Sequence, residues 1–144
     1  MIAVQYPEPD FRMRTENGKR FIFDRLRKAW LLLTGEEWVR QNFVNYLIAG
    51  MHYPPAVIAL EKEIRLHELK KRFDILVYGK DHRPWMLIEC KETGVPLSED
   101  VLQQVLRYNM SVPVRFIIIT NGTHTAGWEK EAGALKLLEA MPGY

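Results

Sequence analysis

Two carboxylates and a lysine stand close together in the middle of the chain, within residues 72–91. Two runs rich in β-forming residues flank six turn-forming residues there, which predicts an antiparallel hairpin. With the turn centred between positions 81 and 82, Asp74 faces Glu89 across the hairpin. Because side chains alternate along a strand, Lys91 shares the face of Glu89. The hairpin therefore gathers two carboxylates and an ammonium group inside otherwise apolar strands.

The facing carboxylates require something that offsets their repulsion. Like charges directly opposite each other destabilise a sheet, and ionised groups are costly to bury. A divalent cation held by oxygen ligands would offset this cost. We therefore expect Asp74 and Glu89 to hold Mg²⁺, with Mn²⁺ as a substitute, and the backbone carbonyl of Cys90 to add a third oxygen. The alternative is a set of surface ion pairs, Asp74 with Lys91 and Glu89 with Arg72.

A metal at this point would activate water and polarise a phosphorus centre, which is the chemistry of phosphodiester hydrolysis. Lys91 would orient the water or stabilise the charge that grows on the phosphate. Glu36 lies on the inward face of a predicted helix and would add a further acid, although it also suits the helix N-terminus electrostatically. Gln104 and Tyr108, four residues apart on a later helix, and Arg72 would contact the substrate.

Length and composition limit the classes of protein to consider. The chain has 144 residues, of which 47% are hydrophobic, so we expect a single domain over residues 1–144, with 1–19 as an extended lead-in. Twenty basic and eighteen acidic residues nearly balance, so charge alone does not indicate a nucleic-acid binder. The single cysteine excludes an intramolecular disulfide and a zinc ribbon. No secretory signal and no bilayer-length apolar run is seen, so we expect a cytoplasmic protein without a membrane partner.

The elements that position these residues follow from local patterns. Thr34 and Glu37 form a capping box that opens a helix ending near Ala49. Ser98 caps a second helix, over residues 99–110. Residues 20–33 could form a short strand followed by a helical turn, which periodicity does not settle. We further expect strands at residues 56–66 and 114–120, and a last helix at residues 126–139. The fold class is therefore α/β, with a mixed sheet.

Several of these residues carry a resemblance to a known family. Asp74, the Glu-Cys-Lys run at 89–91 and the Gln-x-x-x-Tyr pair, behind a helix with Glu36, resemble the PD-(D/E)xK nuclease superfamily. More narrowly, Leu-Thr-Gly-Glu-Glu-Trp-Val-Arg-Gln, Phe-Asp-Ile-Leu-Val-Tyr and Leu-Ile-Glu-Cys-Lys resemble the N-terminal nuclease domain of type I restriction enzyme R subunits in its stand-alone bacterial form. The likeness covers roughly residues 20–125, and Phe73 stands in place of the superfamily's proline.

The resemblance implies a three-layer restriction-endonuclease-like core, in which helices flank a mixed central β-sheet. It implies Asp74 and Glu89 as metal ligands, Lys91 as the catalytic lysine and Glu36 as the helix-borne acid of a Mg²⁺-dependent deoxyribonuclease acting on DNA. The chain has no Gly-rich phosphate loop ending in Lys-Ser or Lys-Thr, so any ATP-driven motion would come from a helicase or translocase partner. A homodimer is also compatible with the sequence.

Two other functions fit the same sequence. One is a catalytically silent nucleic-acid-binding or assembly module of the same fold, and the other is a structural domain without a nucleic-acid partner. Divalent-metal binding separates the nuclease from the structural domain, and DNA cleavage separates it from the silent module. The sequence also predicts that neutralising Asp74 or Glu89 leaves the stability of the metal-free protein unchanged or raises it, because the two carboxylates repel each other.

Overall fold

The computed structural model describes the backbone of all 144 residues and every side chain except those of Leu66 and Leu69. Its elements follow in the order β1 (Met13–Glu16), β2 (Lys19–Asp24), β3 (Ala29–Leu32), α1 (Gly35–Asn45), the π-helical turn η1 (Tyr46–Gly50), the 3₁₀ turn η2 (Pro55–Val57), β4 (Ile58–Leu66), β5 (Leu69–Tyr78), β6 (Pro84–Cys90), α2 (Glu99–Asn109), β7 (Phe116–Thr120), β8 (Thr125–Glu131) and β9 (Ala134–Leu137).

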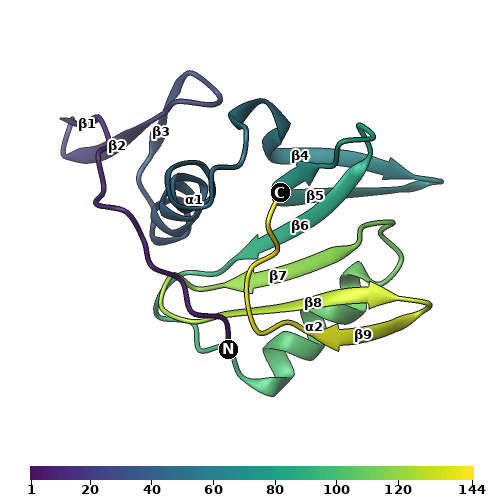
Figure 1. Cartoon of the computed structure of the whole chain (residues 1–144). Helices are drawn as coiled ribbons and strands as arrows, with labels where there is room; N and C mark the ends of the chain where they lie inside the picture. Colours follow the sequence, from purple (N-terminus) through teal and green to yellow (C-terminus); the bar gives the residue numbers. More distant parts are fainter.

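The strands form two sheets (Figure 1). β1, β2 and β3 make a small antiparallel sheet, and β4 to β9 make a six-stranded sheet in which the strands lie in sequence order. Within the larger sheet only β6 and β7 run parallel, with α2 in the connection between them. A parallel pair needs such a crossover, whereas the antiparallel pairs need only turns. The predicted α/β fold with a mixed sheet is confirmed.

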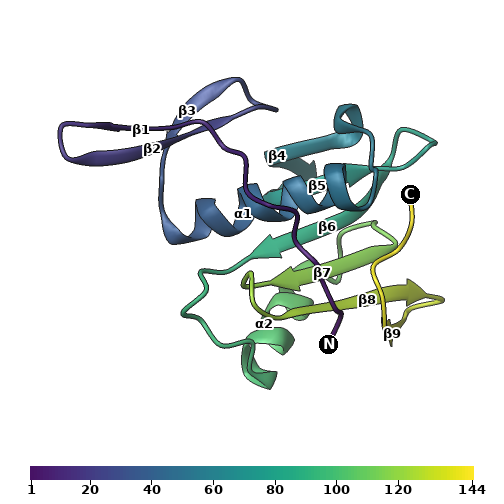
Figure 2. The ribbon, with the colours of Figure 1, turned by 60° about the vertical axis from the view of Figure 1, so that its left-hand side comes forward.

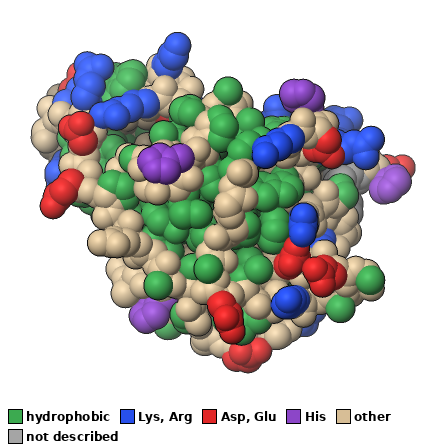
Figure 3. All heavy atoms as spheres, in the orientation of Figure 1, with side chains coloured by type: hydrophobic (Ala, Val, Ile, Leu, Met, Phe, Trp, Pro, Cys, Tyr) green, Lys and Arg blue, Asp and Glu red, His purple; other side chains and the backbone are tan. Residues whose placement is uncertain are grey.

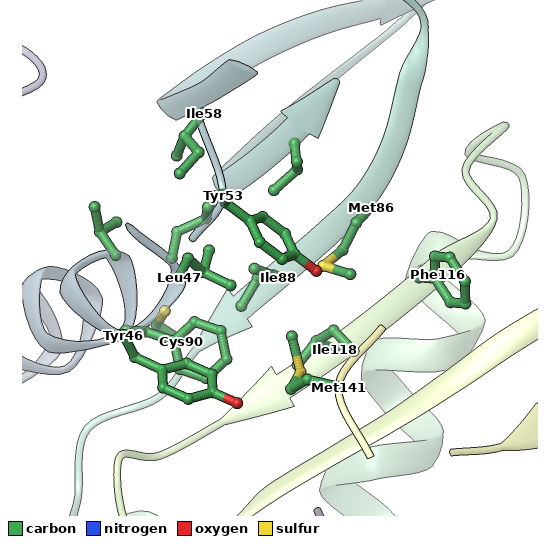
Figure 4. Packing of buried hydrophobic residues seen from close by; sticks show 14 of the residues in the cluster. Tyr46, Leu47, Tyr53, Ile58, Met86, Ile88, Cys90, Phe116, Ile118 and Met141 are labelled. Atoms are coloured by element: carbon green, nitrogen blue, oxygen red, sulfur yellow. The ribbon is translucent and has the colours of Figure 1, made fainter. Parts of the chain in front are cut away.

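The larger sheet carries a helix on each face. Figure 2 shows α1 in front of the sheet and α2 behind it. On the α1 side, Phe43 and Leu47 pack on strand residues such as Ile75 and Ile88, and Figure 4 shows part of this cluster. On the α2 side, Leu106 packs on Leu76, Leu87 and Ile117 of the same strands. This arrangement is consistent with the three-layer restriction-endonuclease-like core.

The two predicted helix starts are confirmed by their caps. Thr34 Oγ1 accepts a hydrogen bond of 3.0 Å from the Glu37 N–H, and the Ser98 side chain accepts one from the Val101 N–H. Each cap satisfies a backbone donor that has no partner inside its helix. The first helix continues through η1 to Gly50, close to its predicted end. None of the described helices is long and apolar enough to cross a membrane.

The predicted C-terminal helix is wrong. The segment forms the β8–β9 hairpin, whose turn residues Ala132 and Gly133 have φ values of +48° and +81°. Two consecutive residues with positive φ make the turn whose twist matches antiparallel strands. β8 also pairs with β7, which would otherwise leave a fully buried strand with an open edge. Tertiary pairing therefore overrides a helix-like spacing of Trp128, Leu135 and Leu138.

The N-terminal region is more structured than the sequence suggests. Residues 20–33 hold most of β2 and all of β3 rather than a strand and a helical turn, and the predicted lead-in contains β1. Ahead of β1, Ile2 is 4% exposed, and its N–H donates to the Thr125 carbonyl at 2.7 Å. The start of the chain therefore packs into the main core, beside β8.

Candidate active site

The predicted hairpin is formed by β5 and β6. Its ladder pairs Ile75 with Ile88, and the same register carried one step further brings Asp74 next to Glu89. In place of a regular backbone contact, the Cys90 N–H donates a hydrogen bond of 2.8 Å to Asp74 Oδ2. The side chain of Cys90 turns into the core and is 2% exposed, so it is not available as a nucleophile. The two carboxylates are neighbours, as predicted.

Asp74 lies at the point where the alternation of side chains along β5 is interrupted. Ile75 packs on the α1 side of the sheet, whereas Phe73, two residues before it, packs on the α2 side. In a regular strand residues two apart share a face. On β4 the residue opposite Asp74 is Glu61, which has a φ of +48°. The ladder passes from Leu60↔Ile75 to Lys62↔Phe73, and Glu61 and Asp74 are not paired in it. This local break lets an acidic residue of an otherwise buried strand project towards α1.

The first turn of α1 places Glu36 at the carboxylate pair. Burial first, and then the charge of Asp74, raises the pKa of Glu36 above its ordinary value. Glu37 points elsewhere: its carboxylate accepts hydrogen bonds from Arg40 and Gln41 at 2.6 and 3.0 Å. The prediction that Glu36 faces Asp74 is therefore confirmed, but its placement on the inward face of the helix is wrong: Glu37 is buried, whereas half of the Glu36 side chain is exposed. Adjacent helix positions point about 100° apart, so both cannot serve.

Arg40 is a member of the site that sequence reasoning missed. Its Nη2 donates to Asp74 Oδ1 at 2.9 Å and to Glu36 Oε1 at 3.1 Å, and only 5% of its side chain is exposed. Burial lowers the pKa of Arg40, but the hydrogen bond to Asp74 and the charges of Glu37 and Asp74 outweigh it and raise the pKa overall. Arg40 follows Glu36 by four residues, the spacing of an ion pair on one helix face, so the sequence did hold a signal.

Glu89 is a partly buried acid beside Asp74. Burial, followed by the charge of Asp74 and a hydrogen bond to it, raises the pKa of Glu89 to about 8. The nearby Lys91 ammonium acts in the opposite direction and lowers it. Among the described residues, the sequence-based ion pairs of Asp74 with Lys91 and of Glu89 with Arg72 are not formed. The alternative of plain surface pairs is therefore wrong in its partners, since Asp74 pairs with Arg40.

The three expected substrate contacts stand apart from the carboxylates. Gln104 and Arg72 are exposed, and Tyr108 is 55% exposed. The Tyr108 ring lies 4.4 Å from Lys71 Nζ, on the α2 side of the sheet. In the described part of the chain no hydrogen bond or ion pair joins these side chains to the carboxylate cluster. Their role in binding a substrate stays a prediction.

The residues present fit a small, hard cation. No three His, Cys, Asp or Glu side chains in the described part of the chain are arranged to hold a metal. Mg²⁺ does not need three, since it is usually held by one or two carboxylates and keeps several waters. The raised pKa of Glu89 indicates that its crowded position favours added positive charge, which a proton or a cation can supply. Asp74 and Glu89 are therefore a chemically suitable pair of ligands.

A chain of ion pairs links this cluster to the small sheet. Arg27 pairs with Asp24 at the end of β2 and, through Nη2, with Glu37 Oε2 at 3.1 Å. Glu37 pairs in turn with Arg40, which holds Asp74. Asp24 is 1% exposed, and Glu37 and Arg40 are also buried, so each charge depends on its neighbours. We call Asp24, Arg27, Glu37, Arg40 and Asp74 the ion-pair chain.

Comparison with known protein families found one match. Residues 35–142, which are 108 of the 144 residues, match the family described as Type I restriction enzyme R protein N terminus (HSDR_N). The matched stretch contains the whole carboxylate cluster and begins just after β3. No curated protein matches the chain.

Proposed function

Since the chain belongs to the family of type I restriction enzyme R protein N termini, we propose that it is a metal-dependent nuclease that hydrolyses DNA phosphodiester bonds. The observation that carries the proposal is the meeting of Glu36, Asp74, Glu89 and Lys91 from three separate elements. Folding buries these acids and brings them together at a cost, since burial first, and then the charge of Asp74, raises the pKa of Glu89. Such a conflict between function and stability is typical of active sites.

Each residue has a role in this proposal. Asp74 and Glu89, with the backbone carbonyl of Cys90, would hold Mg²⁺ or Mn²⁺. The cation would supply Lewis acidity and compensate the negative charge of the scissile phosphate. Lys91 is not engaged in an ion pair among the described residues, so its ammonium can face the phosphate and stabilise the charge that develops there. Arg40 would act as a positioning residue that fixes the Asp74 carboxylate.

Glu36 has a separate role, because half of its side chain is exposed. An acid with a raised pKa at the rim of the cluster can accept a proton from an attacking water and later return it. Gln104, Tyr108 and Arg72 would contact the DNA outside the cluster. A homodimer, a helicase or translocase partner and a cytoplasmic location remain proposals on the sequence alone.

The test is cleavage of labelled single-stranded, duplex and branched DNA with Mg²⁺ or Mn²⁺, alongside metal binding measured by calorimetry. We expect Glu89→Gln to lose metal binding and cleavage, because a neutral amide is a poor ligand for a hard cation. Lys91→Ala should keep metal binding and lose turnover, because its contribution is made in the transition state. Glu92→Gln, an exposed acid next to Lys91, is the matched control and should keep both properties.

A silent nucleic-acid-binding module is the second candidate, and one observation favours it. The guanidinium of Arg40 already gives Asp74 a positive partner, so the site has partial charge compensation without a metal. This candidate predicts DNA binding without cleavage and no gain in melting temperature with millimolar Mg²⁺ or Mn²⁺. That result would refute the nuclease.

A further inference from the structure

The small sheet has one face on α1 and one face towards solvent. Ile22 and Asp24 point inwards and are almost fully buried. Directly paired residues of antiparallel strands share a face, and so do alternate residues of one strand. From the pairs Arg14↔Phe21, Phe21↔Leu32 and Phe23↔Trp30, the other face of the sheet presents Arg12, Arg14, Glu16, Lys19, Phe21, Phe23, Trp30 and Leu32. We call these residues the outer face.

Aromatic rings and arginines alternate on the outer face. The Arg14 guanidinium lies 4.4 Å from the centre of the Trp30 ring, and that of Arg12 lies 4.8 Å from the Phe23 ring. Phe23 and Trp30 themselves meet edge to face at 5.3 Å between centroids. The rings are half-buried, whereas both arginines are exposed. Phe23 and Trp30 therefore form an edge-to-face pair, and the two guanidinium groups lie over the faces of these rings.

The charge on the outer face is mostly positive. Arg12, Arg14 and Lys19 stand against one acid, Glu16, which pairs with Arg14 at 3.3 Å between side chains that are each about half exposed. In Figure 3, Lys and Arg side chains gather over the small sheet, at the upper left of the molecule. Exposed pairs of this kind are weak, so Glu16 leaves Arg14 free to exchange partners. The face suits a partner that is both anionic and flat.

We propose that the outer face binds unpaired nucleotides of a DNA strand. Bases stack on aromatic side chains and on guanidinium planes, and the phosphates between them are neutralised by Arg and Lys. The choice of DNA rests on the proposed nuclease function, whereas the preference for unpaired nucleotides rests on the rings. The outer face precedes residues 35–142, so the family match does not include it.

Other occupants fit the outer face less well. An acidic peptide would use the cations but gain nothing specific from three aromatic rings. A duplex hides its bases from a flat face and would again use only the cations. A purely apolar partner would have to bury both arginines, which is costly. An anionic polymer with exposed flat bases uses every group that the face presents.

The test is binding of a fluorescein-labelled oligothymidylate, followed by anisotropy in EDTA. Trp30→Leu keeps an apolar side chain but removes the ring, and it should weaken binding at least about fivefold, the loss expected for one stacked base. Arg12→Gln combined with Arg14→Gln should lower the dependence of log K on log salt by about 1.4, or 0.7 for each phosphate contact. Lys80→Gln, which removes an exposed cation 5.8 Å from the Tyr144 ring, is the matched control and should leave binding unchanged.

Several results would overturn the inference. One is equal affinity of Trp30→Leu and the unmodified protein for the oligothymidylate. Others are equal affinity of the protein for duplex and single-stranded DNA, or competition by polyglutamate as strong as that by single-stranded DNA. If Trp30→Leu does not fold, photocrosslinking of the unmodified protein to an iodouracil oligonucleotide decides instead. Crosslinks to Phe21, Phe23 or Trp30 support the inference, and crosslinks elsewhere alone refute it. Binding is measured without metal, so it does not depend on cleavage. Absence of cleavage would count only against the proposed nuclease function. Cleavage without this binding would count only against nucleotide binding by the outer face.

Discussion

Asp74 and Glu89 stand side by side but have different neighbours. Asp74 accepts hydrogen bonds from Arg40 and from the Cys90 N–H, and these donors compensate its charge. The pKa of Glu89 is raised by burial and then by Asp74, with only Lys91 acting in the opposite direction. A carboxylate with two donors and a carboxylate crowded by another acid respond differently when they are neutralised.

The first prediction revises the sequence-based expectation that either acid can be neutralised without loss of stability. Asp74→Asn should lower the free energy of unfolding by about 1–3 kcal/mol, because it leaves the buried guanidinium of Arg40 with one carboxylate fewer. Glu89→Gln should leave it unchanged or raise it, because the amide removes an acid whose charged form is disfavoured by burial and by the charge of Asp74. Urea unfolding of the metal-free variants measures both. Equal losses in the two variants would show that the acids share one environment.

The second prediction concerns pH. The pKa of Glu89 is about 8 in the folded protein, against an ordinary value of 4.5. Between these values the folded state holds a proton that the unfolded state has released, so the stability from Glu89 is fully present below about pH 4.5 and is lost as the pH rises through about 8. The melting temperature of the unmodified protein should therefore fall relative to Glu89→Gln from about pH 5 to about pH 9. Parallel curves would contradict the raised pKa.

At the residue scale the sequence predicted the acids but not their counter-ion. Asp74, Glu89 and Lys91 were identifiable because charged residues inside apolar strands conflict with the local pattern. Arg40 lies on an amphipathic helix, where an arginine suits either the solvent or the interior. Only the approach of α1 to the break in β5 decides between them, and that approach is a tertiary contact.

At the scale of elements, the hairpin of β8 and β9 differs most from the prediction. Apolar residues at 128, 135 and 138 fit a helical period, and no alternation is clear enough to outweigh it. The helices at Thr34 and Ser98 and the hairpin at 72–91 were predictable because caps and turn formers are local signals. Whether residues 125–137 form a helix or strands depends on pairing with the open edge of β7, which the local sequence does not reveal.

The third prediction tests this hairpin. Ala132 has a φ of +48° beside Gly133, and Asn tolerates that conformation better than Ala. Ala132→Asn should therefore raise the free energy of unfolding by about 0.5–1 kcal/mol. Ala134→Asn, two residues on in β9, is the control and should not stabilise, because Asn is disfavoured in strands. A helix over this segment would lose stability with Asn at both positions.

At the scale of the whole molecule, the family match and the folded unit do not coincide. Residues 35–142 contain the carboxylate cluster, but Ile2 packs in the main cluster and Arg27 enters the ion-pair chain. A Cβ on Gly127 would lie 2.9 Å from Ile2 Cδ1, so the chain start packs tightly on β8. The matched stretch is therefore completed by residues that precede it.

The fourth prediction follows from this packing. Ile2→Ala should cost about 2 kcal/mol or more of unfolding free energy, because it opens a cavity in the core. Residues this close to a chain end usually tolerate substitution. Gln5→Ala, at an exposed position in the same segment, should change the stability by no more than about 0.5 kcal/mol. Guanidinium unfolding measures both, and equal small effects would mean that the segment does not stabilise the core.

The interruption of β5 at Asp74 also affects the order in which parts of the protein unfold. Beyond that point the β4–β5 hairpin has mostly exposed side chains and is held on the α2 side by Phe73 and Ile64. Local opening of such an outer half needs less free energy than global unfolding. Amides at 62–65 and 70–72 should then exchange hydrogen faster than those at 75–77. Because Asp74 sits at the boundary, gentle heating should disable the site at temperatures where the core is still intact.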